Sequence, residues 1–138
     1  MILLDTNVIS ELMKPAPDAG VRAWILAQRR ENLFTCTIAV AEVLSGLDLM
    51  PAGKRRTQLL ERTEFMFANL FTGRILDFDL AAARHLGPVL KAARAAGKPI
   101  DEVDALIAAI ALSHHFAVAT RNIAHFRGTG IKLINPWD

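Results

Sequence analysis

The segment Met1-Ile2-Leu3-Leu4-Asp5-Thr6-Asn7-Val8-Ile9-Ser10 opens the chain with a short apolar run that ends at an aspartate. Such a run is typical of a buried strand, and the apolar spacing that follows it is helical. The same switch between strand-like runs and helical spacing recurs along the chain. It predicts an α/β fold, in which helices alternate with the strands of a mostly parallel sheet.

The apolar pattern predicts about five strands and six helices. Strands are expected at residues 2–4, 33–36, 75–76, 117–119 and 131–134, and helices at residues 7–13, 18–29, 38–49, 54–71, 80–96 and 102–114. No linker or repeat interrupts the 138 residues, so we expect a single domain, residues 1–138.

Composition excludes several classes of protein. A hydrophobic content of 52% is too high for a disordered or fibrous chain. No apolar run reaches 18 residues and the N-terminus lacks a signal peptide, so we expect a cytoplasmic protein with no membrane contact. Cys36 is the only cysteine, which rules out an internal disulfide, and its apolar surroundings favour a buried, inert thiol.

Four acidic or amide side chains adjoin the apolar segments. Asp5 and Asn122 follow predicted strands, while Glu42 and Asp104 lie near the starts of predicted helices. In open parallel sheets, ligands bind outside the carboxyl ends of the strands. We therefore expect these four side chains to converge on one cleft, although they are far apart in sequence.

Converging carboxylates repel one another, and they either share protons or bind a hard cation through oxygen ligands. Zinc is disfavoured because His114 and His115 are adjacent, which is not a helical ligand spacing. Mg²⁺ or Mn²⁺ fits better, and such an ion activates water for phosphodiester hydrolysis. The chain has a net charge of +2, so a metal ion that neutralised three acids would leave the remaining surface more basic. The local cluster Lys54-Arg55-Arg56 could contact phosphates, or it could be only a solvated group of charges.

Two of the three acids also have a simpler interpretation. Asp5 could be only the N-cap of the first helix, and Asp104 could be only a helix-start acid favoured by the helix dipole. Glu42 has no such alternative, because its apolar neighbours argue against surface exposure. We interpret Glu11 as a solvated helix residue and His125 as a structural or surface histidine, with a role in the cleft left open for both.

Several stretches in the same order resemble the PIN-domain ribonucleases, and specifically the VapC and FitB-like toxins of bacterial toxin–antitoxin pairs. The resemblance spans nearly the whole chain. It is carried by residues 5–12, by Val40-Ala41-Glu42-Val43 with Gly46, by residues 104–109, by Thr120-Arg121-Asn122 with Phe126, and by Asn135-Pro136-Trp137. One such motif alone would be weak, but together in register they are specific.

The resemblance implies a three-layer α/β/α sandwich and a Mg²⁺- or Mn²⁺-dependent endoribonuclease. It also implies a homodimer, or a higher assembly, that is inhibited by a cognate VapB- or FitA-like antitoxin. Carried over to this sequence, the metal ligands are Asp5, Glu42 and Asp104, and Asn122 joins them as a catalytic position. Thr6, Asn7 and Thr120 would support Asp5, and Arg121 would contact an RNA phosphate or pair with a surface carboxylate.

Asn122 departs from the family pattern, in which many relatives have a carboxylate at this position. An amide supplies an oxygen without charge, so one firmly held ion is more plausible than two. Two alternatives therefore stay open. The chain could be a PIN-like RNA-binding or regulatory module with little or no catalysis, or a phosphatase-like hydrolase with Asp5 as nucleophile, although position 7 is Asn where a second Asp is usual.

Apolar clusters on the predicted helices have two possible roles. Trp24-Ile25-Leu26, Phe65-Met66-Phe67 and Leu70-Phe71 could contact a second copy or the antitoxin, or they could fill the core.

Overall fold

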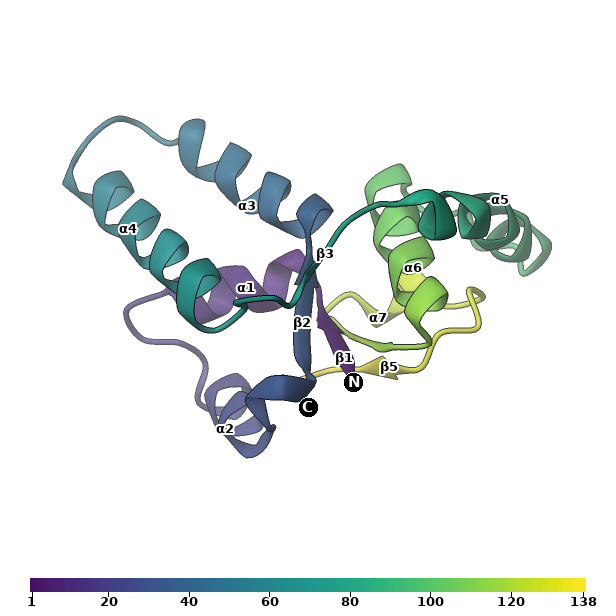
Figure 1. The fold of residues 1–138 in the computed structure, drawn as a ribbon, viewed down its shortest axis with the longest axis horizontal. Coiled ribbons are helices and arrows are strands. Elements are labelled where there is room, and N and C mark those ends of the chain that lie inside the picture. Colours follow the sequence, from purple (N-terminus) through teal and green to yellow (C-terminus); the bar gives the residue numbers. More distant parts are fainter.

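The computed structural model describes all residues, 1–138, and places five strands in one parallel sheet (Figure 1). The strands are β1 (Ile2–Leu4), β2 (Leu33–Cys36), β3 (Ile75–Leu76), β4 (Ala117–Ala119) and β5 (Leu133–Ile134). Their order across the sheet is β3-β2-β1-β4-β5, and every neighbouring pair is parallel. The first strand of the chain is therefore the central strand of the sheet.

Helices cover both faces of this sheet. They are α1 (Thr6–Met13), α2 (Ala19–Ala27), α3 (Thr37–Asp48), α4 (Lys54–Asn69), α5 (Leu80–Ala95), α6 (Glu102–His114) and α7 (Ile123–Phe126), with a 3₁₀ turn at Arg30–Asn32. The chain steps from β1 to β2 to β3 in one direction and then returns past β1 to β4 and β5. Right-handed crossovers put the helices of these two paths on opposite faces. Figure 1 shows α1–α4 on one side of the strands and α5–α7 on the other.

The fold predicted from the sequence is confirmed, with small differences at the ends of elements. Helix α6 has the predicted bounds, while β5 begins at Leu133, two residues later than predicted. The short helix α7 and the 3₁₀ turn were not predicted, because a single turn of helix carries too little apolar periodicity to be recognised.

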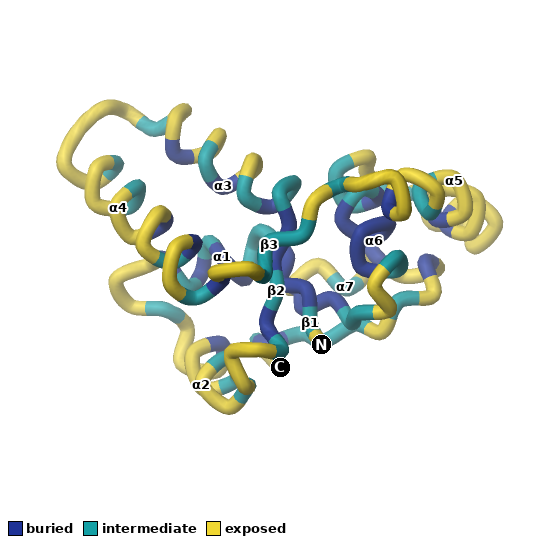
Figure 2. The backbone as a smooth tube through the Cα atoms, in the orientation of Figure 1, coloured by how far each residue is buried: buried dark blue, intermediate teal, exposed yellow.

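The core lies around β1 and α6 (Figure 2). Leu3 and Leu4 are fully buried although they point to opposite faces of the sheet, as expected for the central strand of a covered parallel sheet. Residues 107–111 of α6 are fully buried as well, so this helix is enclosed on several sides. Cys36 is also buried, which raises the pKa of its thiol to about 11 and makes it unreactive at neutral pH.

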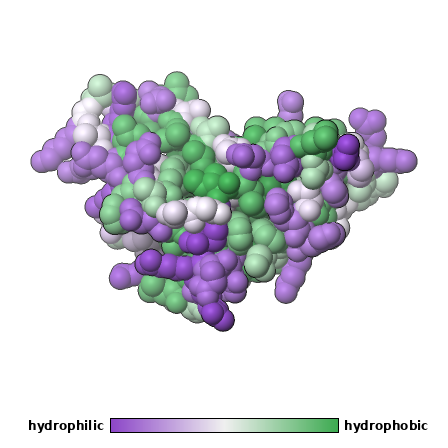
Figure 3. Space-filling model, viewed as in Figure 1, coloured by the Kyte–Doolittle hydropathy of each residue, from purple (hydrophilic) through white to green (hydrophobic).

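The apolar clusters divide between core and surface. Phe67 and Phe71 are buried in the core, whereas Phe65 is 70% and Leu26 is 74% exposed. In Figure 3, hydrophobic atoms gather near the middle of the face, and the outer ends of the helices are largely hydrophilic. No helix combines the length and the apolar character that crossing a bilayer would require.

The turn between α7 and β5 packs closely against the end of α5. Gly128 has a φ of +89°, and a Cβ atom at this position would lie 2.9 Å from the Cβ of Ala96. Gly130, two residues later, has a φ of +81° but open space around its Cα. Both positions need the left-handed backbone that glycine tolerates, and only Gly128 also needs the missing side chain.

We expect Gly128→Ala to destabilise the protein more than Gly130→Ala. Both substitutions cost about 1 kcal/mol of backbone strain, and Gly128→Ala adds a packing clash of roughly 1–3 kcal/mol. Urea unfolding of the two variants measures the difference directly. Equal losses of stability would mean that the turn does not pack against α5 as described.

Candidate active site

A cleft opens where the chain direction across the sheet reverses, at the carboxyl ends of β1 and β4. Such a reversal leaves a crevice between the helices of the two faces, which is where open α/β sheets bind ligands. The cleft has a volume of about 450 Å³. It is lined by Asp5, Thr6, Asn7, Ser10, Glu11, Lys14, Glu42, Asp104, Arg121, Asn122 and Trp137. The four residues expected to converge, Asp5, Glu42, Asp104 and Asn122, all line it.

Asp5 occupies the deepest position of the four, with 3% of its surface exposed. It follows β1 directly and is the N-cap of α1, where its Oδ1 accepts a hydrogen bond from the Thr6 backbone N–H at 2.7 Å. Its Oδ2 accepts from the Thr120 hydroxyl at 2.8 Å and from the Asn7 amide at 3.2 Å. Capping thus accounts for one oxygen only, and the other belongs to a network in the cleft.

Asn7 and Thr120 tie the end of β4 to the start of α1. The Asn7 Nδ2 also donates to the Thr120 hydroxyl at 3.2 Å, and its Oδ1 accepts from the Arg121 backbone N–H at 3.1 Å. The Thr120 hydroxyl accepts from the Asn122 backbone N–H at 3.0 Å. These bonds hold the loop carrying Arg121 and Asn122 against Asp5.

Glu42 lies on α3 and is exposed at the mouth of the cleft. Its Oε1 accepts a hydrogen bond from the Thr6 hydroxyl at 2.5 Å, so Thr6 contacts Glu42 through its side chain and Asp5 through its backbone. The interpretation that apolar neighbours exclude exposure of Glu42 is wrong. Val40 and Leu44 are themselves only partly buried, because α3 borders the cleft instead of crossing the core.

Asp104 lies in the first turn of α6, but its side chain does not cap the helix. The N-cap position is Asp101, and Asp104 Oδ2 instead lies 3.2 Å from Nδ1 of His125. His125, on α7, is therefore in contact with a cleft residue and is not merely a surface histidine. Its ring remains 58% exposed, so it stays open to solvent while it holds Asp104.

The electrostatics of the cleft favour added positive charge. The pKa of Asp5 is raised to about 6, chiefly by burial; hydrogen bonds from Thr120 and Thr6 oppose the rise, and the negative charges of Asp104 and Glu42 contribute to it. Burial also raises the pKa of Asp104, although His125 opposes this. No lysine or arginine pairs with any of the three acids. The carboxylates therefore lack a permanent counter-charge apart from a titratable histidine.

The donor set suits a hard divalent cation. Three carboxylates and one amide supply oxygen atoms only, which is the chemistry that Mg²⁺ and Mn²⁺ prefer. No three of the acidic, histidine or cysteine side chains are already arranged to hold an ion, however. Glu42 is bonded to Thr6 and Asp104 to His125, so these two side chains would have to rotate inward to reach a shared ligand.

Four residues of the cleft were not predicted as part of the site or were interpreted differently, namely Ser10, Glu11, Lys14 and Trp137. Glu11 is 7% exposed and pairs with Lys14 at 3.2 Å, so its interpretation as a solvated glutamate is wrong. Its spacing of four residues from Asn7 puts both on one face of α1, which was the available signal. Ser10 and Trp137 were noted only as members of motifs, and Lys14 gave no signal. Placing Lys14 and Trp137 at the cleft requires knowing where α1 ends and how the chain runs after β5.

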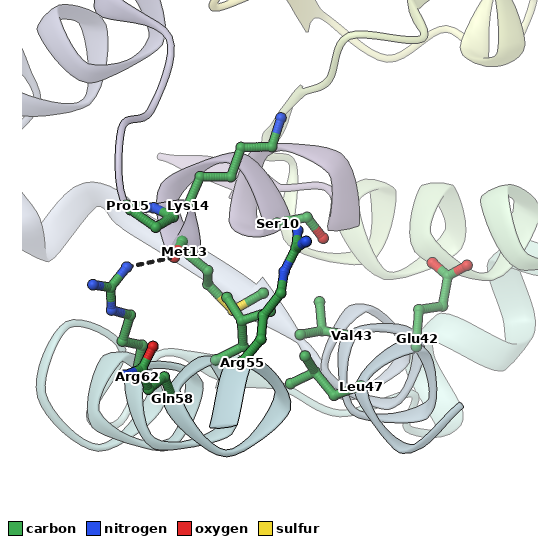
Figure 4. Close-up of a pocket in the computed structure, with 12 residues that line it drawn as sticks. Ser10, Met13, Lys14, Pro15, Glu42, Val43, Leu47, Arg55, Gln58 and Arg62 are labelled. Carbon is green, nitrogen blue, oxygen red and sulfur yellow. Dashed lines mark hydrogen bonds between the residues drawn. The ribbon is translucent and has the colours of Figure 1, made fainter. Parts of the chain in front are cut away.

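A second hollow of about 420 Å³ adjoins the cleft between α1, α3 and α4 (Figure 4). The two hollows share Ser10, Lys14 and Glu42. The apolar base of the second hollow is formed by Met13, Val43, Leu47 and Leu59. Its basic rim is formed by Lys14, Arg55 and Arg62. Figure 4 shows that Arg62 reaches the end of α1, where it donates to the Met13 carbonyl at 3.3 Å.

Comparison with known proteins gives consistent matches over the whole chain. The family model for the PIN domain matches residues 2–130. The VapC ribonuclease Y4jK of Sinorhizobium fredii is 49% identical over 138 residues, covering 100% of this chain and 99% of the relative. Toxin FitB of Neisseria gonorrhoeae is 41% identical and covers 99% of each chain.

Solved structures agree with the sequence relatives. A structure of FitAB bound to an IR36 DNA fragment superimposes with a TM-score of 0.93 at 40% identity, covering 100% of this chain and 96% of the other. The fold of this chain is thus shared with that of a solved FitAB structure. The chain is a member of the PIN-domain family, in the group that includes the VapC and FitB toxins.

Proposed function

We propose that this protein is a Mg²⁺- or Mn²⁺-dependent endoribonuclease and the toxin of a toxin–antitoxin pair. The observation that carries the proposal is the convergence of Asp5, Glu42 and Asp104, without a lysine or arginine partner, on one cleft at the sheet reversal. The names of the relatives, a VapC ribonuclease and a toxin, support both parts.

Asp5, Glu42 and Asp104 would hold the cation, with the Asn122 amide as a neutral oxygen beside them. A bound divalent cation lowers the pKa of a coordinated water and offsets negative charge that develops on a phosphoryl oxygen. Glu42 and Asp104 would exchange their present partners, Thr6 and His125, for the ion.

The remaining cleft residues position these groups and the substrate. Asn7 and Thr120 fix the orientation of Asp5 through its Oδ2, and their removal would leave that carboxylate free to turn. Arg121 and Lys14 are exposed cations at the rim, suited to contact the phosphates of a single-stranded RNA. His125 would release Asp104 and stay within reach of the cleft as a proton donor or acceptor.

The hollow beside the cleft supports the proposal of an antitoxin partner. Its apolar base and basic rim suit an amphipathic segment that carries acidic residues. A homodimer is supported by the exposed apolar side chains, among them Phe65 and Leu80, which a monomer would leave in water. An RNA substrate would place the protein in the cytoplasm.

We also propose that residues 1–138 form a single PIN domain. The first and last strands of the chain, β1 and β5, both pair with β4 in one sheet. The chain therefore cannot be divided into two segments that each form a separate sheet.

A second candidate is a PIN-like RNA-binding or regulatory module without catalysis. The absence of three side chains already arranged for an ion favours it, as does the amide at position 122. Metal-dependent cleavage separates the two candidates.

We expect the purified protein to cut RNA only when Mg²⁺ or Mn²⁺ is present, leaving 5′-phosphate and 3′-hydroxyl ends. Asp104→Asn and Glu42→Gln should each lower the cleavage rate roughly 100-fold or more, because each removes a charged ligand. The rate is measured on end-labelled RNA, with and without EDTA.

Matched controls for these variants lie on the same helices. Glu102→Gln and Asp48→Asn remove exposed acids of α6 and α3 that do not line the cleft, and both should cut at the parental rate. RNA binding without metal-dependent cleavage by the parent would support the non-catalytic module instead.

The raised pKa of Asp5 predicts that the stability of the protein in metal-free buffer depends on pH. This pKa is about 6 in the folded protein, against an ordinary value of 3.8 for an aspartate, so the folded state holds the proton more tightly. Stability is therefore lost as pH rises from about 4 to above 6, by roughly 3 kcal/mol at most. Asp5→Asn cannot titrate and should lack this loss.

Urea unfolding of the parent and Asp5→Asn in EDTA at pH 4, 6 and 8 measures this effect. The difference between the two free energies of unfolding should move in favour of Asp5→Asn with rising pH. A constant difference across this range would contradict the account of an uncompensated buried carboxylate.

A further inference from the structure

Arg121 and Trp137 form a stacked pair at the edge of the cleft. The guanidinium carbon of Arg121 lies 5.2 Å from the centre of the Trp137 ring, within the range of a cation–π contact. Both residues line the cleft together with Asp5, Asp104 and Asn122. A planar cation and an indole thus lie beside the acids that would act on a phosphodiester.

Local hydrogen bonds fix both partners of the pair. The Arg121 backbone N–H donates to Asn7 Oδ1 at 3.1 Å, and the preceding residue, Thr120, bonds to Asp5. The Trp137 backbone N–H donates to Asn135 Oδ1 at 3.0 Å in the turn after β5. Arg121 is therefore linked to Asp5 through Asn7 and Thr120, and Trp137 is held in a local turn that follows β5.

The chemical character of the pair differs from the rest of the cleft. Trp137 is the only aromatic residue among those lining it, in a chain that has two tryptophans and no tyrosine. Arg121 is exposed and forms no ion pair, although four carboxylates line the same cleft. A pairing of Arg121 with a surface carboxylate, one of the two sequence interpretations, does not occur.

We propose that the Arg121–Trp137 pair is a stacking platform for the nucleobase next to the cleaved phosphate. The inference deepens the proposed ribonuclease function and rests on it. Single-stranded RNA is recognised by bases that splay out and stack on aromatic rings or on guanidinium planes. Arg121 offers a planar face for stacking and N–H donors at its edge, so it can contact a base and a neighbouring phosphate together.

A structural role for Trp137 alone does not account for the arrangement. The ring packs partly against the core, but half-burial leaves part of it facing the cleft. Packing needs neither the guanidinium nor an indole at the cleft wall. Stacking requires both a π surface and access from the cleft, and the pair has both.

Tryptophan fluorescence tests the proposal directly, because a stacked base quenches indole emission. The parent for the test is Asp5→Asn with Trp24→Phe, in EDTA, so that RNA stays intact and Trp137 is the only tryptophan. The probes are a single-stranded oligouridylate and an abasic oligonucleotide of equal length, which has phosphates but no bases. We expect the oligouridylate to quench the emission and to bind more tightly than the abasic probe.

Variants separate stacking from charge and from folding. Trp137→Leu keeps apolar packing and should weaken oligouridylate binding roughly 5- to 150-fold, as loss of one stacked base does. It should leave the affinity for the abasic probe unchanged. Arg121→Lys keeps the charge but not the plane, and should likewise weaken only the base-bearing probe. Thermal melts check that each variant is folded.

Several results would overturn the platform. These are binding of the oligouridylate without quenching, equal affinity for the two probes, equal losses for both probes in Trp137→Leu, or no RNA binding at all. The proposed function is judged separately, by metal-dependent cleavage with the unmodified protein. Cleavage without quenching removes the platform and keeps the enzyme, while quenching without cleavage leaves an RNA-binding module that has the platform.

Discussion

A buried carboxylate at the end of the central strand is the constraint on which the rest of the site depends. Asp5 must follow β1 to cap α1, and β1 must be central for the cleft to open beside it. Burial is the main reason that its pKa is raised to about 6, so the ionised form of Asp5 lowers the stability of the folded protein. A fold selected only for stability would place a neutral cap such as serine here.

The surroundings of Asp5 orient its carboxylate but do not neutralise it. Thr6, Asn7 and Thr120 donate hydrogen bonds, and no lysine or arginine pairs with it. At the cleft rim, Lys14 pairs with Glu11 and Arg121 stacks on Trp137, so neither cation pairs with Asp5, Glu42 or Asp104. Lys14 and Arg121 thus lie near Asp5, Glu42 and Asp104 without forming ion pairs with them. The carboxylate oxygens of these three residues remain available to a ligand that binds from solvent.

The sequence predicted the fold because strand burial and helix spacing are local patterns. Residues 2–4 read as a buried strand and proved to be the central one. Asp5 and Asn122 were placed in one cleft by a topological rule, since residues that follow parallel strands meet at one edge. The rule needs no knowledge of individual side-chain contacts.

What the sequence could not predict depends on tertiary geometry. The exposure of Glu42 follows from α3 lying beside the cleft, and its apolar neighbours gave the opposite signal. Contact between His125 and Asp104 requires the unrecognised helix α7. Trp137 reaches the cleft only because the segment after β5 returns toward the end of β4, and no local pattern encodes that return.

The most direct test is calorimetric titration of the RNA-free protein with Mn²⁺, because the account requires the acids themselves to bind the ion. It predicts saturable binding of about one ion per chain, weakened at least tenfold in Asp104→Asn and unchanged in Glu102→Gln. No binding at millimolar Mn²⁺, or equal binding by Asp104→Asn and the parent, would contradict the account.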